Sequence, residues 1–303
     1  MNTGVAIQGR RAQGAAQAAR LVIGLFKLRI GLLIMLTALV GLAVTPGPAL
    51  SPVQVLVLAF TVLLASASAG AFNQYVERES DRLMARTRAR AFATGALRAH
   101  AGWLALFALM LVAAVATTWV VLNGWSALYV FLGAFTYGVV YTVWLKRRSS
   151  LNIVIGGLAG SFAVLAGGAA VDPGLGPLPL LLALVLFLWT PPHFWALAIA
   201  GHADYAAAGV PMLPVVAGVP RAARVVYAST IALLVASLLP ALFGAGWVYT
   251  AGAAAGGLLF VREARALAQA PSRRTAMRTF FASLVQLSLL LIVASIDGML
   301  RAA

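Results

Sequence analysis

The sequence contains no cysteine, which excludes disulfide bonds, thiolate metal sites and cysteine nucleophiles. Three histidines among 303 residues leave little material for a histidine-rich metal site. Acidic residues are also scarce, at seven against 22 basic ones, and only 10% of the residues are charged. Because 62% are hydrophobic, the composition excludes an ordinary soluble globular protein and indicates a polytopic membrane protein.

Apolar runs occur along almost the whole chain, and their periodicity and length predict membrane-spanning helices. We predict nine spans, at 28–45, 53–72, 101–120, 125–144, 152–171, 178–199, 223–244, 247–262 and 279–298. The division near residue 245 depends only on the short segment 243–247. The predicted fold class is therefore all-α, a polytopic integral membrane bundle of about nine transmembrane helices.

The basic residues give this bundle an orientation, because lysine and arginine accumulate in cytoplasmic loops. With nine spans, 21 of the 22 basic residues fall on the side of the N-terminus, and Arg301 alone falls on the other. We therefore predict a short cytoplasmic tail at 1–20 and a single transmembrane domain at 21–303. This topology accounts for the net charge of +15 without nucleic acid as a partner.

Residues 73–90 hold three of the seven acids, Glu77, Glu79 and Asp81, directly after an apolar run. On a helix, Asn73, Glu77 and Asp81 recur every four residues and share one face. Such a face offers hard oxygen ligands for Mg²⁺, and the arginines that follow suit phosphate oxygens. A charged loop that only sets orientation is the alternative, but an asparagine one turn before two stacked carboxylates argues against it.

A second polar stretch, 189–214, follows four spans later. Asp204 is the candidate carboxylate there, and Pro191-Pro192 is expected to interrupt span six beside a cavity. His193 lies within the apolar zone, where an ionisable group is a functional candidate by default. A neutral histidine bonded to a neighbouring carbonyl is the structural alternative for His193.

Aromatic and polar residues also mark the exit from span four. Tyr137 and Tyr141 are four residues apart, as packing or interfacial tyrosines often are, but aromatic faces with Trp144 would also stabilise an allylic cation. Span five presents small residues suited to close helix contact. Those small residues are Gly156, Gly157 and Gly160, and the exit of span four is further marked by Lys146, Arg147, Arg148 and Asn152.

Together these residues resemble the UbiA superfamily of intramembrane prenyltransferases, over nearly the whole chain after residue 20. The first aspartate-rich element of that family matches Asn73, Glu77, Asp81, Arg86-Thr87 and Arg90. The haem-modifying branch is matched by Tyr141-Thr142, Lys146-Arg147, Asn152, Pro192-His193-Phe194 and Asp204-Tyr205. The pattern differs at Ala91, Ala96 and Ala163-Val164, where the family has proline, a basic residue and a proline pair.

The resemblance implies transfer of farnesyl from farnesyl diphosphate to a vinyl group of haem B, with water, to give haem O and diphosphate. It implies a central cavity open to the cytoplasmic side of a bacterial inner membrane, with haem B as substrate and Mg²⁺ bound with diphosphate. Contact with haem A synthase or a terminal oxidase assembly is a further expectation. The implied metal ligands are Asn73, Glu77, Asp81 and Asp204.

The implied substrate contacts are Arg86, Arg90, Lys146, Arg147, His193, Tyr137 and Asn152, and Tyr141 is expected to be catalytic by shielding the farnesyl cation from water. For His193, axial ligation of haem and a propionate contact both stay open. Two other functions also remain as alternatives. Prenylation of a quinone precursor is disfavoured by the single acid, Asp204, at the second element, and a transporter would need no carboxylate face beside arginines.

Overall fold

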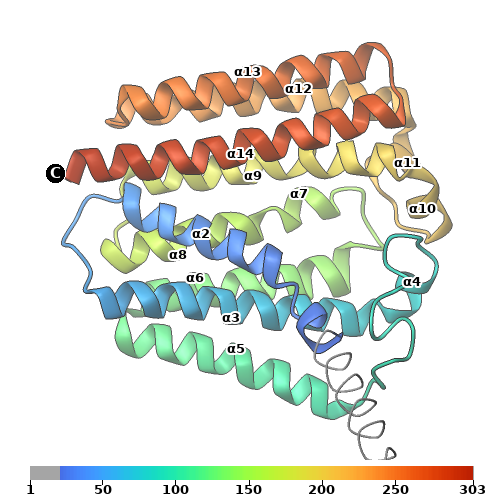
Figure 1. The fold of residues 1–303 in the computed structure, drawn as a ribbon, viewed down its shortest axis with the longest axis horizontal. Coiled ribbons are helices and arrows are strands. Elements are labelled where there is room, and N and C mark those ends of the chain that lie inside the picture. Colours follow the sequence, from blue (N-terminus) through green and yellow to red (C-terminus); the bar gives the residue numbers. More distant parts are fainter. Residues whose placement is uncertain (1–20, 303) are drawn as a thin grey trace, which may run out of the picture.

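The computed structural model describes residues 21–302, and the predicted N-terminal tail at 1–20 lies outside them. The described part is built of helices, without a strand, and Figure 1 shows the long ones side by side. They are α2 (Leu28–Val44), α3 (Pro52–Val76), α4 (Arg78–Arg82), α5 (Ala101–Val121), α6 (Gly124–Phe135), η1 (Thr136–Leu145), α7 (Asn152–Gly156), α8 (Leu158–Val171), α9 (Pro177–Ala200), α10 (His202–Ala207), α11 (Leu213–Ala217), α12 (Val219–Leu238), η2 (Leu239–Phe243), α13 (Trp247–Gln269) and α14 (Arg273–Ala302).

Each apolar run of the sequence forms a helix or two consecutive helices, so the all-α prediction is confirmed. By length and composition, seven helical stretches within the described residues can cross a membrane, and the chain is a multi-pass membrane protein. Helix α2 is apolar but only 17 residues long. Helix α13 is not among the seven, and its second half carries charged residues. The count of nine spans, the single domain and the central cavity therefore stay predictions.

The predicted division near residue 245 is confirmed. Helix α12 tightens into the 3₁₀ turn η2, and the chain then reverses at Gly244 with φ of +96°, a left-handed conformation that favours glycine. Helix α13 begins three residues later, at Trp247.

The predicted interruption at Pro191-Pro192 is wrong, because α9 continues through both prolines to Ala200. A proline in a helix removes one backbone donor, and neighbouring helices can hold the helix together around the loss. Here both prolines are buried, and α9 lies against α12, α14 and α8.

Close packing between α2 and α8 sets the centre of the bundle. A β-carbon added at Gly167 would lie 1.8 Å from the carbonyl oxygen of Ala38, and one at Gly41 would lie 2.2 Å from that of Val164. The predicted contact face of span five is partly confirmed. Added β-carbons at Gly156 and Gly157 would lie 2.9 Å from Tyr141 and 3.0 Å from Thr190, but one at Gly160 would meet nothing within 4 Å.

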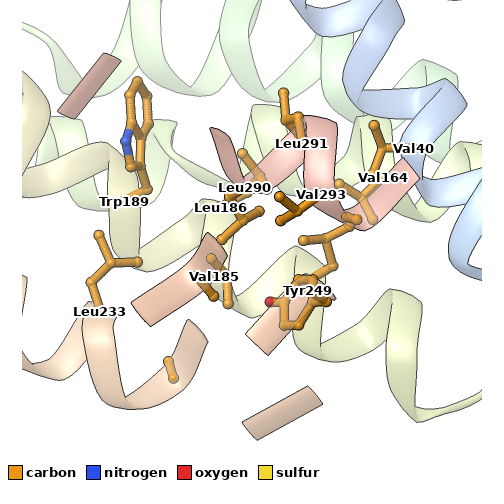
Figure 2. Close-up of a cluster of buried hydrophobic side chains, with 14 of the residues drawn as sticks. Val40, Val164, Val185, Leu186, Trp189, Leu233, Tyr249, Leu290, Leu291 and Val293 are labelled. Atoms are coloured by element: carbon orange, nitrogen blue, oxygen red, sulfur yellow. The ribbon is translucent and has the colours of Figure 1, made fainter. Parts of the chain in front are cut away.

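Beside this contact lies a large apolar core. Figure 2 shows side chains of this core from several helices, among them Val40 of α2, Val164 of α8, and Leu290, Leu291 and Val293 of α14. Burial of this much apolar area against neighbouring helices fixes their relative positions. This core holds the long helices together and so fixes the positions of the polar residues at their ends.

The two polar stretches that the sequence singled out lie at one end of that frame. In Figure 1, α4 and the α10–α11 segment both project at the right-hand end of the bundle. This common location brings together residues from opposite halves of the chain.

Candidate active site

The first polar stretch continues the helical spacing of α3 past its end. The backbone N–H of Glu77 donates to the carbonyl of Asn73 at 3.0 Å, and that of Asp81 donates to the carbonyl of Glu77 at 2.8 Å. Asn73, Glu77 and Asp81 therefore occupy consecutive turns, as their spacing predicts. Their exposed fractions are 2%, 3% and 0%, so all three side chains are buried.

Buried carboxylates need partners, and the structure supplies one cation for each. Lys146 Nζ forms an ion pair with Glu77 Oε1. One terminal nitrogen of Arg90 contacts both oxygens of Asp81, at 2.8 and 2.9 Å, and lies 3.9 Å from Glu77 Oε2. The structure thus brings four predicted site residues into one cluster.

Lys27 joins this cluster, although the sequence did not single it out. Its ammonium donates to Asn73 Oδ1 at 2.6 Å and to the Tyr137 hydroxyl at 3.2 Å, and Asn73 Nδ2 donates to Thr142 Oγ1 at 3.0 Å. Burial, and next the nearby Arg90, lower the pKa of Lys27 to about 7. One feature of the sequence could have indicated Lys27 as a site residue: it is one of two lysines in the chain and directly precedes the first predicted span.

The π-helical segment η1 contributes the tyrosine side chains that contact the two lysines of the cluster. Its wider turn is visible where the Lys146 N–H donates to the Tyr141 carbonyl five residues earlier, at 2.9 Å. The rings of Tyr137 and Tyr141 stack with centroids 5.7 Å apart. Lys27 lies over the first ring and Lys146 over the second, at 5.7 and 5.8 Å. Segments of this kind often occur at functional sites.

Asn152 supports the same segment from α7. Its Nδ2 donates to the Lys146 carbonyl at 3.2 Å, and its Oδ1 is buried without a partner among the described residues. An unpaired buried carbonyl is costly, and the predicted substrate contact of Asn152 stays a prediction. The predicted phosphate contacts Arg86 and Arg147 are exposed, and among the described residues neither forms a hydrogen bond or ion pair with the cluster.

Asp204 lies on α10 and is half-buried. Within residues 21–302, no three histidine, aspartate or glutamate side chains gather closely enough to hold a metal ion, so Asp204 does not complete a three-carboxylate site with Glu77 and Asp81. The two polar stretches do meet through an apolar cluster, in which Met84 and Tyr205 are buried and Tyr141 packs against them. Participation of Asp204 stays a prediction.

His193 lies elsewhere, on α9, and its side chain contacts α14. Its ring stacks on Trp189 and on Phe280, with centroids at 4.1 and 4.7 Å, and its Nδ1 is 2.6 Å from Ser283 Oγ. No contact within the described residues links it to Glu77 or Asp81. The carbonyl partner considered from the sequence is therefore wrong, because the partner is a hydroxyl.

Comparison with known proteins places this geometry in a family. The model of the "UbiA prenyltransferase family" matches residues 34–285. Protoheme IX farnesyltransferase 2 of Paramagnetospirillum magneticum is 55% identical over 282 residues, which cover 93% of this chain and 98% of the relative. Protoheme IX farnesyltransferase of Gluconacetobacter diazotrophicus is 39% identical over 88% of this chain and 87% of its own length.

Solved structures share the fold at low sequence identity. A structure described for digeranylgeranylglyceryl phosphate synthase in membranes has a TM-score of 0.78 at 16% identity, covering 93% of this chain and 99% of that one. A UbiA homologue of Archaeoglobus fulgidus bound to DMAPP and Mg²⁺ has a TM-score of 0.71 at 16% identity, covering 89% and 98%. From the family match and these relatives, the chain belongs to the UbiA prenyltransferase family and is a prenyltransferase enzyme.

Proposed function

We propose that this chain transfers the farnesyl group of farnesyl diphosphate to a vinyl group of haem B, with addition of water, to give haem O and diphosphate. The observation that carries the proposal is the buried cluster of Asn73, Glu77 and Asp81 with its attendant cations, a site suited to a metal-bridged diphosphate. The choice of haem B as the acceptor is supported by the names of the relatives, which are up to 55% identical to this chain.

The donor atoms of the cluster fit Mg²⁺, which prefers carboxylate and amide oxygens. Asn73 Oδ1 and the carboxylates of Glu77 and Asp81 would hold it from one side. Asp204, from the second polar stretch, would have to come closer to join them, because the three carboxylates are not gathered in this structure. When bound, Mg²⁺ acts as a Lewis acid on the diphosphate. The A. fulgidus homologue, bound to DMAPP and Mg²⁺, supports this assignment.

The cations of the cluster then have a chemical role. As the C–O bond of farnesyl diphosphate breaks, negative charge accumulates on the leaving diphosphate. Arg90 and Lys146 lie within the cluster and offset that charge, and the exposed Arg86 and Arg147 are the further proposed contacts of the diphosphate. Preorganised charges of this kind stabilise the transition state without further reorganisation.

The stacked rings of Tyr137 and Tyr141 border the same cluster, where the farnesyl cation forms. Their faces attract positive charge and exclude water, which would otherwise convert the cation to farnesol. The terminal vinyl carbon attacks the cation and forms the new C–C bond. Water then adds to the carbon left positive beside the porphyrin, and its proton leaves to solvent.

His193 is the proposed contact to haem B. Its neighbours among the described residues are aromatic rings and a hydroxyl, and none of them is an anion that would favour an imidazolium for a propionate contact. The neutral ring favours axial ligation of the haem iron over a propionate contact. We place the enzyme in the bacterial inner membrane with a cytoplasmic N-terminus, where haem A synthase or a terminal oxidase assembly could receive its product.

The direct test uses the purified chain in lipid nanodiscs with Mg²⁺, farnesyl diphosphate and haem B. Mass spectrometry should show haem gaining one farnesyl group and one hydroxyl group. An aromatic quinone precursor serves as the competing acceptor in a parallel reaction. Prenylation of that acceptor, with haem B unchanged, would contradict the proposed function.

A further inference from the structure

Each predicted metal ligand at the α3–α4 junction already contacts a basic side chain of its own. The three pairs are Lys27 with Asn73, Lys146 with Glu77, and Arg90 with Asp81. The basic residues come from three different parts of the chain, 46, 69 and 9 residues from their partners. The pairing is therefore a property of the folded site, and no single sequence motif contains it.

These contacts oppose the binding of a bare divalent cation. The carboxylates of Glu77 and Asp81 are almost fully buried and are balanced by Lys146 and Arg90, whose side chains are 12% and 22% exposed. A metal ion arriving alone would face two positive charges a few ångströms away in a medium that screens weakly. Displacing those cations would leave them partly buried without anionic partners, which is costly.

A diphosphate removes this obstacle because it brings its own anionic oxygens. Lysine and arginine bind phosphate oxygens as readily as carboxylates, so the displaced side chains exchange one partner for another. The carboxylates become free for the metal ion in the same step, and no buried charge is left unpaired.

We infer that Lys146 and Arg90 hold the carboxylates of Glu77 and Asp81 until a prenyl diphosphate arrives and then transfer to its oxygens, so that metal ion and diphosphate bind as a unit. Lys27 does the same at Asn73, which makes it a positioning residue for the diphosphate. The inference rests on the proposed function. It adds that the metal ion binds only together with the diphosphate.

The test measures divalent cation and diphosphate affinities separately, with Mn²⁺ as the probe. Mn²⁺ binding to the wild type and to Lys146→Gln is followed by electron paramagnetic resonance in nanodiscs of neutral lipid, without diphosphate. Binding of inorganic pyrophosphate is then measured by calorimetry in excess Mg²⁺. Arg148→Gln is the matched control. Arg148 is two residues from Lys146 in the sequence, and its side chain is exposed and outside the cluster, so the variant also removes one positive charge.

Loss of the Lys146 charge should strengthen binding of bare Mn²⁺ at least about tenfold, because a like charge near the ion is removed. The same substitution should weaken pyrophosphate binding by about tenfold or more, as expected for loss of a charge-assisted contact. Arg148→Gln should leave both affinities near those of the wild type. An unchanged Mn²⁺ affinity in Lys146→Gln, or an unchanged pyrophosphate affinity, would overturn the inference.

The wild type provides a test that does not depend on folding of the variant. Without diphosphate it should not bind Mn²⁺ measurably below millimolar concentrations, and micromolar affinity would overturn the inference. Haem farnesylation is scored in a separate assay with the wild type. If haem B stays unmodified there while the Mn²⁺ and pyrophosphate results are as expected, the proposed acceptor fails and the joint binding of metal ion and diphosphate stands.

Discussion

Nδ1 of His193 lies 2.6 Å from Oγ of Ser283, although 90 residues separate them along the chain. The same hydroxyl lies 2.6 Å from the Phe280 carbonyl, which can only accept a hydrogen bond. A hydroxyl has one hydrogen to donate, so the carbonyl receives it and His193 must donate from Nδ1. His193 is therefore held as the tautomer whose Nε2 carries the free lone pair, the form required of a metal ligand.

Replacement of His193 by alanine should lower haem O output about tenfold or more, in line with losses seen when metal-ligand geometry is disturbed. Haem is extracted from membranes and quantified by chromatography, and the absorption spectrum of bound haem B reports the loss of the ligand. Ser283→Ala should shift both readouts in the same direction by a smaller amount.

The control for this series is His202→Ala, which removes a half-buried imidazole on α10. It should leave haem O output and the spectrum near the wild-type values. Normal haem O formation in His193→Ala would remove His193 from the site.

Glu77→Gln should reduce the rate of haem O formation by about 10²–10³, the loss expected when one electrostatic catalytic group is removed. The matched control is Glu79→Gln, two residues away, whose side chain is 63% exposed and, within residues 21–302, forms ion pairs with Arg78 and Arg82 alone. Steady-state rates with saturating farnesyl diphosphate distinguish the two variants. Equal rates in the two variants would contradict a catalytic role for the buried Glu77 carboxylate.

Tyr141→Leu should redirect the reaction more than slow it. Without the aromatic face beside the cation, water captures more farnesyl, and the ratio of farnesol to haem O should rise severalfold. Tyr141→Phe keeps the ring and should keep the wild-type ratio. Product partition is measured by mass spectrometry of a single reaction, and an unchanged ratio in the leucine variant would contradict the shielding role.

Gly167→Ala should destabilise the bundle, since its β-carbon would lie 1.8 Å from the Ala38 carbonyl oxygen and force α2 and α8 apart. The expected cost is about 1–3 kcal/mol, typical of overpacking. Gly160→Ala on the same helix has open space around its β-carbon and should change little. Thermal unfolding in one detergent measures both, and equal midpoints would contradict the close helix contact.

The helices were predictable because membrane spans depend on local composition. Apolar runs predicted the positions of the long helices, and the short turn near Gly244 was sufficient to separate α12 from α13. The same local reasoning failed at Pro191-Pro192, because packing by neighbouring helices keeps α9 continuous where propensity alone favours a break.

The site was predictable only along one helix. Periodicity placed Asn73, Glu77 and Asp81 on one face, but it could not show that Lys146, 69 residues from Glu77, would pair with it. Such pairings depend on how η1 packs against α3, a long-range property. The contribution of Lys27 was missed for the same reason.

The most direct measurement of the central claim is extraction of haems from membranes carrying the wild type or Asp81→Asn, resolved by chromatography and mass. Farnesylated haem should appear with the wild type and fall to background with Asp81→Asn, at equal protein levels in the membrane. Haem B that stays unmodified with the wild type, or haem O formed equally by both chains, would contradict the account.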